Sequence, residues 1–274
     1  MTDHKSERPI DRMIREMEKK YSIEAIQSLN IISNYISDSL RDKTIINNLN
    51  KVVISFAEEL KQVSEIEKYY LNRIDKIKEL GWSLSSLLIE ANIIEDDDTM
   101  TDESIFWFYK ANNYKKLFYE LESIKYYCKD EFEDTMDLII DLLKIDMKYY
   151  SLCVGTLFAI IDYSFVYQLE DGNMKNGEYL NKKNKKRYST KIKTDRKVLN
   201  SKRNITSYEL IIDNYFKSTN FKNKDLTRHA IAHGRYNLKE ISESDFFKIV
   251  NVCSTFSEFN NPKASITFIE DEEL

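Results

Sequence analysis

The sequence predicts an all-helical protein, and two observations carry that prediction. Glycine and proline are scarce, with 5 and 2 in 274 residues, whereas sandwiches, barrels and doubly wound sheets need many turns built from these residues. Apolar residues also recur at spacings of three and four along most of the chain, which is the period of an amphipathic helix. With 42% hydrophobic and 32% charged residues, the chain has the composition of a globular protein.

Residues 1–100 are expected to form an N-terminal helical region. Apolar stripes predict helices over 10–21, 23–40 and 45–77, and Gly81 suits a helix end because glycine adopts the left-handed conformation at little cost. These helices are expected to pack as a hairpin or bundle, with a long coiled-coil arm as the alternative. The acidic stretch 95–103 lacks the ligand spacing and central glycine of an EF-hand, so we interpret it as a linker.

Residues 101–274 are expected to form a second helical domain. Its predicted helices cover 118–128, 132–147, 149–169 and 246–256, the last preceded by an approximate capping box of Ser242 and Asp245. The helix over 149–169 is apolar on nearly every face, which predicts the centre of a bundle or a subunit interface. Asp162 interrupts its apolar run well before the roughly 20 residues that a membrane span needs, so no membrane association is expected.

A basic segment, 171–207, is the sharpest change in composition. It holds twelve Lys or Arg against three Asp or Glu, a net of +9 in a chain of net −5, so the remainder carries −14. One interpretation is a solvated insertion in the helical domain. The other is a phosphate-contacting loop, since clustered cations gain affinity by releasing counterions, with Tyr179 and Tyr188 placed to stack on bases. The candidate RNA-binding residues are Lys182, Lys183, Lys185, Lys186 and Arg187, together with Arg235 further along the chain.

Several classes of chemistry find no support in the sequence. There is no P-loop, dinucleotide-binding, zinc-protease or esterase motif, and the three cysteines are widely spaced, so no cofactor and no metal site are expected. Unpaired cysteines and a highly charged N-terminus favour a cytoplasmic protein.

The chemically richest segment is Arg228-His229-Ala230-Ile231-Ala232-His233-Gly234. On a helix, His229 and His233 share one face, and Gly234 is expected to end that helix. Arginine can hold phosphate oxygens bidentately while histidine moves a proton, so the pattern suits a phosphodiester substrate. A partial metal site, or two histidines that merely cap a helix end, are the alternatives.

These residues resemble the signature of the HEPN superfamily, in which an arginine and a following polar residue precede a histidine by a few positions. Four residues separate Arg228 from His233, and the sequence of residues 228–234 is similar to that of abortive-infection and toxin-like bacterial members. Thr227 stands where many relatives have asparagine. The resemblance covers about residues 130–260. It implies a dimeric helical bundle and, in the preceding long helix, an acidic residue facing the site, which would be Asp162. A buried structural acid is the alternative role for Asp162.

The resemblance implies a metal-independent endoribonuclease in phage defence or a toxin system. The ribose 2′-hydroxyl would attack the adjacent phosphate, with His233 as general acid or base and Arg228 stabilising the transition state. His229 would orient phosphate or share the proton transfer, and Asp162 would orient Arg228 or a histidine. An antitoxin or sensor protein is a further expected partner. The competing hypothesis is a non-catalytic helical dimer that serves as a protein-interaction or nucleotide-binding module.

Overall fold

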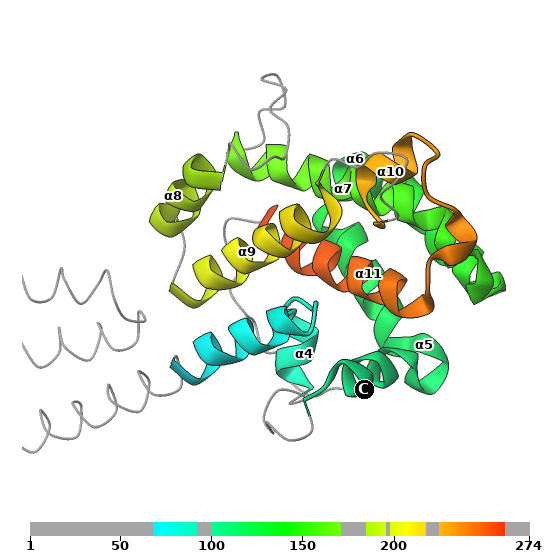
Figure 1. Cartoon of the computed structure of the whole chain (residues 1–274), viewed down its shortest axis with the longest axis horizontal. Helices are drawn as coiled ribbons and strands as arrows, with labels where there is room; N and C mark the ends of the chain where they lie inside the picture. Colours follow the sequence, from blue (N-terminus) through cyan, green and yellow to red (C-terminus); the bar gives the residue numbers. More distant parts are fainter. Residues whose placement is uncertain (1–67, 92–99, 171–184, 196–197, 218–224, 261–274) are drawn as a thin grey trace, which may run out of the picture. The chain divides into compact units, whose positions relative to one another are not determined.

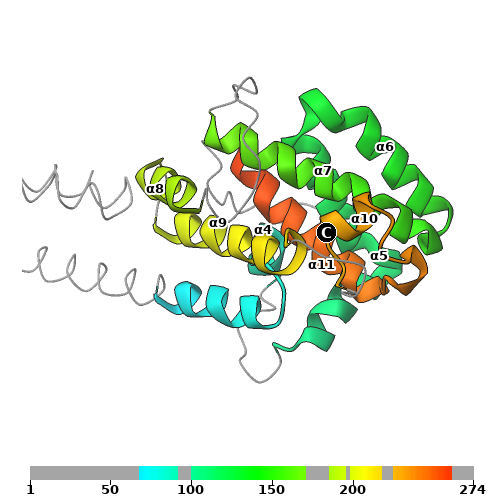
Figure 2. The same ribbon diagram turned by 45° about the horizontal axis from the view of Figure 1, so that its top comes forward.

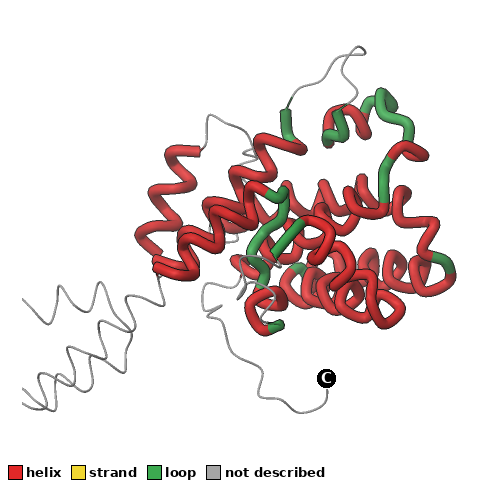
Figure 3. The backbone as a smooth tube through the Cα atoms, turned by 60° about the horizontal axis from the view of Figure 1, so that its bottom comes forward, coloured by secondary structure: helices red, strands yellow, loops and turns green. Residues whose placement is uncertain are grey.

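The fold was analysed in a computed structural model that describes residues 68–91, 100–170, 185–195, 198–217 and 225–260. The chain divides into two compact units, 1–70 and 71–274, and the account below concerns the second. Every regular element within the described ranges is helical, which confirms the all-α class (Figures 1 and 3). The helices expected over 10–21 and 23–40, and most of the one over 45–77, lie outside the described residues.

The described ranges hold the following elements in chain order. After helical residues 68–79 come α4 (Ser86–Glu90), α5 (Asp102–Tyr127), α6 (Lys129–Ile145), a 3₁₀ turn (Met147–Tyr149) and α7 (Tyr150–Leu169). The second half holds α8 (Lys185–Asp195), α9 (Val198–Leu210) with a π-helical turn (Ile211–Tyr215), α10 (Arg228–Ala232), a 3₁₀ turn (Leu238–Glu240), α11 (Glu243–Ser257) and a last 3₁₀ turn (Glu258–Asn260).

The structure confirms two helix boundaries that the sequence predicted, one at Gly81 and one at Ser242. Gly81 has φ +84°, and the amides of Gly81 and Trp82 donate to the carbonyls of Lys78 and Ile77 at 2.9 and 3.1 Å, which ends the preceding helix. Ser242 and Asp245 form a reciprocal capping box, each side chain accepting from the other's backbone amide at 3.1 Å.

The central helix of this unit is α11, which packs against α5, α7 and α9. All its residues from Ile249 onward are buried, including polar Asn251, Ser254 and Thr255, so this part of the expected amphipathic helix is enclosed on every side. By contrast α7, which the sequence marks as the most apolar helix, leaves Leu152 60% exposed and also exposes Gly155 and Ala159. Residues Met147–Leu169 are long and apolar enough to cross a membrane, but 61% of their most apolar window is buried inside the protein.

Helix α5 is longer than predicted and contains a break. It starts at Asp102, capped by Thr101, rather than near residue 118. Three consecutive residues, Asn112, Asn113 and Tyr114, have φ values of 52°, 54° and 63°, in the left-handed region. Asparagine tolerates that region well. Tyr114 is held there by Glu243 of α11, which accepts hydrogen bonds from Tyr114 Oη at 3.0 Å and from Lys110 Nζ.

The basic segment differs from the expected loop. Residues 185–195 and 198–207 are helical, and Tyr188 is fully buried and stacked on Tyr208 with ring centroids 4.8 Å apart. Tyr188 therefore belongs to the core and is unavailable for base stacking, because its ring is enclosed by neighbouring aromatic residues. Tyr179 and residues 171–184 lie outside the described residues.

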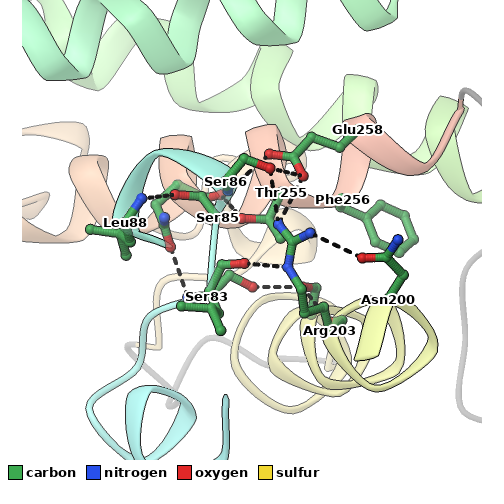
Figure 4. A network of polar contacts seen from close by, with 12 residues as sticks. Ser83, Ser85, Ser86, Leu88, Asn200, Arg203, Thr255, Phe256 and Glu258 are labelled. Atoms are coloured by element: carbon green, nitrogen blue, oxygen red, sulfur yellow. Dashed lines mark hydrogen bonds and ion pairs between the residues drawn. The ribbon is translucent and has the colours of Figure 1, made fainter. Parts of the chain in front are cut away.

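A buried polar network links three parts of the fold, which are the segment before α4, helix α9 and the end of α11 (Figure 4). The Arg203 guanidinium donates to the Leu84 carbonyl and to Glu258 Oε2, both at 2.8 Å, and the side chains of this ion pair are 2% and 8% exposed. Glu258 also accepts from the Ser86 amide and hydroxyl at 3.3 and 3.1 Å. Hydrogen bonds therefore satisfy a charge that would otherwise be costly to bury.

Candidate active site on α7 and α10

The Arg228–His233 motif is built on a very short helix with a defined start and end. Thr227 caps α10 by accepting from the Ala230 amide at 3.1 Å, and both residues are fully buried. Gly234, at φ +61°, ends it as the sequence predicted, with its amide donating to Ile231 O at 3.1 Å. The next amide, of Arg235, returns to Ala230 O at 2.8 Å, completing a Schellman turn.

Helix α10 packs against α7, as Figures 1 and 2 both show. Across this contact, Arg228 Nη2 and Asp162 Oδ2 form an ion pair at 2.5 Å, with side chains 43% and 17% exposed. The Arg228 guanidinium also lies 5.4 Å from the centre of the Phe216 ring, a cation–π contact. These two contacts restrict the arginine, while much of its side chain still faces solvent.

Burial dominates the electrostatics of Asp162. It raises the pKa of this carboxyl to about 6, and the nearby Arg228 charge opposes that shift without cancelling it. Within the described residues, the second carboxylate oxygen, Oδ1, is buried and has no hydrogen-bond partner. An acid with one orphaned oxygen is a poor contributor to stability, which favours a role in orienting Arg228.

A pocket of about 280 Å³ opens beside this ion pair. Its wall is mostly apolar, with Asp162 and Arg228 as its charged members. The lining residues are Gly155, Phe158, Ala159, Asp162, Arg228, Ile231 and Ala232. The exposed small residues of α7 are therefore the floor of a cavity beside the motif, and a Cβ added at Gly155 would meet only Ile231, at 3.8 Å.

The two histidines lie together on α10, with His229 as its second residue and His233 as its C-cap. Their ring centroids are 4.5 Å apart in an edge-on arrangement, with His233 exposed and His229 half-buried. The Arg235 guanidinium reaches back to His229, with 2.7 Å between Nη1 and Nε2. Desolvation lowers the pKa of His229, and the neighbouring His233, Arg235 and Arg228 charges lower it further.

The structure thus brings together Arg228, His229, His233 and Asp162, and adds Arg235 to them. Sequence reasoning had grouped Arg235 with the basic RNA-binding residues and missed its contact with His229. Gly234 was the sequence signal for this contact, because a left-handed glycine just after a helix turns the chain back over the last helical turn.

The remaining basic residues lie elsewhere. Lys186 and Arg187 are exposed on α8, and Arg187 Nη2 pairs with Glu170 at 2.7 Å. Helix α8 meets the C-terminal end of α7, where Tyr188 bonds Gln168, whereas α10 covers the middle of α7. Lys182 and Lys183 lie outside the described residues, and Lys185 is described only as the first residue of α8.

Among the residues that the structure describes, there is no group of three or more His, Cys, Asp or Glu side chains that could hold a metal ion. Comparison of the chain with protein-family models, with curated proteins and with solved structures finds no match. The described fold and site are those of an all-helical unit with a pocket lined by Arg228 and Asp162, beside a pair of histidines.

Chemically, the arrangement suits an anion. One guanidinium lines the pocket and is paired with a carboxylate, and the same segment carries two imidazoles in contact with each other and a second guanidinium bonded to one of them. Such a group can bind a phosphate and exchange a proton with an adjoining hydroxyl.

Proposed function

We propose that this protein is a metal-independent endoribonuclease of the HEPN type, acting in the cytoplasm in phage defence or as a toxin. The observation that carries the proposal is the pairing of Arg228 with Asp162 of α7, beside the His229–His233 pair. Arg228 and Asp162 are distant in the sequence and meet at a pocket, and this contact supports the proposal.

In the proposed reaction the ribose 2′-oxygen forms a bond to the adjacent phosphorus as the bond to the 5′-oxygen breaks. His233 accepts the 2′-hydroxyl proton or supplies the proton that the leaving 5′-oxygen needs, and the other of these two protons is exchanged with solvent water. Arg228 stabilises the additional negative charge on the phosphoryl oxygens, and Asp162 holds its guanidinium in place. The 5′ fragment then ends in a 2′,3′-cyclic phosphate. The nucleophile is part of the substrate and is already held next to its target.

The proposal includes a homodimer, with RNA as the substrate and an antitoxin or sensor protein as a further partner. One copy of the site presents few cations to a polyanion, and a second copy would double them. Sedimentation at micromolar concentration tests this part, and a strict monomer would contradict it.

The deciding experiment incubates the purified full chain with RNA in EDTA. Cleavage to cyclic-phosphate ends is expected from the parent and should fall by about 10²–10⁴-fold in His233→Ala, the usual contribution of general acid–base catalysis. The control is Lys239→Ala, which removes an exposed cation from the turn after the motif. A requirement for a divalent metal, or 3′-hydroxyl products, would contradict the mechanism.

A non-catalytic interaction module is the second candidate, and exposed apolar side chains favour it. Leu138, Ile145 and Leu152 are 71%, 77% and 60% exposed on α6 and the start of α7. Exposed aliphatic residues of this kind suit a protein partner. If the parent cuts no RNA in EDTA or with metal, this candidate replaces the first.

A further inference from the structure

The contact between Arg235 and His229 bears on the protonation state of the His229 imidazole. A guanidinium remains protonated in proteins and has only N–H donors. Its Nη1 lies 2.7 Å from His229 Nε2, so Nε2 must be the acceptor in this hydrogen bond. A histidine whose Nε2 accepts is neutral, and its ring proton is on Nδ1.

The backbone makes this contact a built feature of the fold. Gly234 takes the left-handed conformation at φ +61°, and the Arg235 amide donates to Ala230 O at 2.8 Å. This turn brings a residue six positions along the chain back beside His229. Because the turn is held by its own hydrogen bonds, the side chain of Arg235 starts from a fixed Cα next to the imidazole.

We infer that Arg235 is a positioning residue that holds His229 neutral with its proton on Nδ1, so that proton transfer at this site falls to His233 alone. The part about proton transfer rests on the proposed ribonuclease function, whereas the protonation state of His229 is a property of the folded chain.

The charged groups around His229 agree with this assignment. His233, Arg235 and Arg228 of its own segment face it, and α7, the helix packed against α10, contributes Asp162, which is bonded to Arg228. A cationic His229 would place a second positive charge against the Arg235 guanidinium. The lowered pKa of His229 likewise favours the neutral imidazole.

Imidazole ¹⁵N NMR of the full chain tests the protonation state without any substrate. The parent, Arg235→Met and a control, Lys239→Met, are titrated between pH 5 and 8, and His229→Gln assigns the signals. In the parent and the control, His229 Nε2 should give the resonance of an unprotonated nitrogen. In Arg235→Met, the proton should redistribute toward Nε2, and the pH of half-protonation should rise by at least about half a unit, the scale of shift that a neighbouring charge produces.

A parent in which His229 carries its proton on Nε2 would overturn the inference. So would an Arg235→Met variant whose His229 tautomer and titration match the parent.

The pH–rate profile of RNA cleavage tests the second part. His229→Gln keeps an acceptor for Arg235, and it should lower the rate while leaving the shape of the profile unchanged, because the residue does not titrate in the mechanism. Arg235→Met should add an ionisation to the acid limb. A His229→Gln profile that loses one limb would overturn the assignment of proton transfer to His233. If the parent cleaves no RNA, the proposed function fails while the NMR result still decides the tautomer.

Discussion

Asp162 and Arg228 meet through one oxygen and one nitrogen, at 2.5 Å, although they belong to helices far apart in the sequence. This contact uses Nη2 of the guanidinium, which also lies 5.4 Å from the centre of the Phe216 ring. A fork–fork pair would have used two nitrogens and left less of the arginine for a ligand. The geometry therefore suits an arginine that is oriented by its carboxylate and still able to bind an anion.

Asp162→Asn separates an orienting role from a structural one. RNA cleavage should fall, because the amide lacks the charge that fixes Arg228. Stability should not fall at pH 7.5. Burial raises the Asp162 pKa to about 6, so the stability that this group contributes is present below its unfolded value and is lost as the pH rises through about 6. A neutral amide escapes that loss.

The measurements are thermal unfolding and cleavage rate for the parent, Asp162→Asn and the exposed control Asp141→Asn. Lower stability at pH 7.5, with cleavage declining only in step with folding, would identify Asp162 as a structural acid.

The sequence predicted the local part of this site and missed what depends on the fold. The spacing of Arg228, His229 and His233, with Gly234 after them, depends only on neighbouring residues. Asp162 was reached by family resemblance, since no sequence pattern indicates which distant acid will face an arginine. The contact of Arg235 with His229 was missed because it depends on the turn geometry at Gly234.

The helices show the same division. Their type and several ends were predictable from apolar spacing, capping and glycine. The burial of α11 was not, because Asn251, Ser254 and Thr255 look like solvent-facing residues until their partners are known. Asn251, for example, accepts from the Ser83 amide at 2.7 Å, and that contact joins residues from distant parts of the chain. The left-handed break in α5 had a weak signal in Asn112 and Asn113.

The helical structure of 185–207 changes how the basic segment should be tested. Deleting residues 175–203 would remove the buried side chains of Tyr188 and Arg203 and damage the core. Replacing exposed Lys186 and Arg187 together by Gln leaves the core intact. If both contact phosphates, the log–log salt slope of RNA binding should become shallower by about 1.4, at about 0.7 for each contact on a single strand.

Fluorescence anisotropy across a salt series measures that slope. The charge-matched control is Lys115→Gln with Lys144→Gln, two exposed cations on α5 and α6. An unchanged slope for the α8 variant would mean that these two cations are only solvated.

The buried ion pair of Arg203 and Glu258 should be essential to stability. Arg203→Met leaves Glu258 as an unpaired charge that is 8% exposed, which should cost about 3–5 kcal/mol of unfolding free energy. Adding Glu258→Gln to that variant should recover part of the loss. Urea unfolding measures these values. The control is the neighbouring Lys202→Met, whose side chain is 37% exposed and pairs with Asp75 at the surface, with less than about 1 kcal/mol expected. A loss for Arg203→Met as small as the control's would contradict this role.

A second buried carboxylate, Glu120, is 1% exposed and lies within the same core. It accepts a hydrogen bond from Tyr109 Oη at 2.7 Å, and Tyr109 in turn accepts from Asn251 Nδ2 at 3.0 Å. Burial raises the Glu120 pKa to about 7, and hydrogen bonds from neighbouring hydroxyls oppose the shift only in part. Glu120 should therefore couple folding to pH near neutrality.

Glu120→Gln isolates that coupling, because Gln keeps an acceptor for Tyr109 and carries no charge at any pH. In the parent, the stability that Glu120 contributes is present below its unfolded pKa and is lost as the pH rises through about 7. The variant should therefore melt at a higher temperature than the parent at pH 8, and the difference should shrink toward pH 5. The exposed Glu131→Gln on α6 should track the parent throughout. If the melting temperature of Glu120→Gln differed from that of the parent by the same amount at every pH, Glu120 would not titrate in this range.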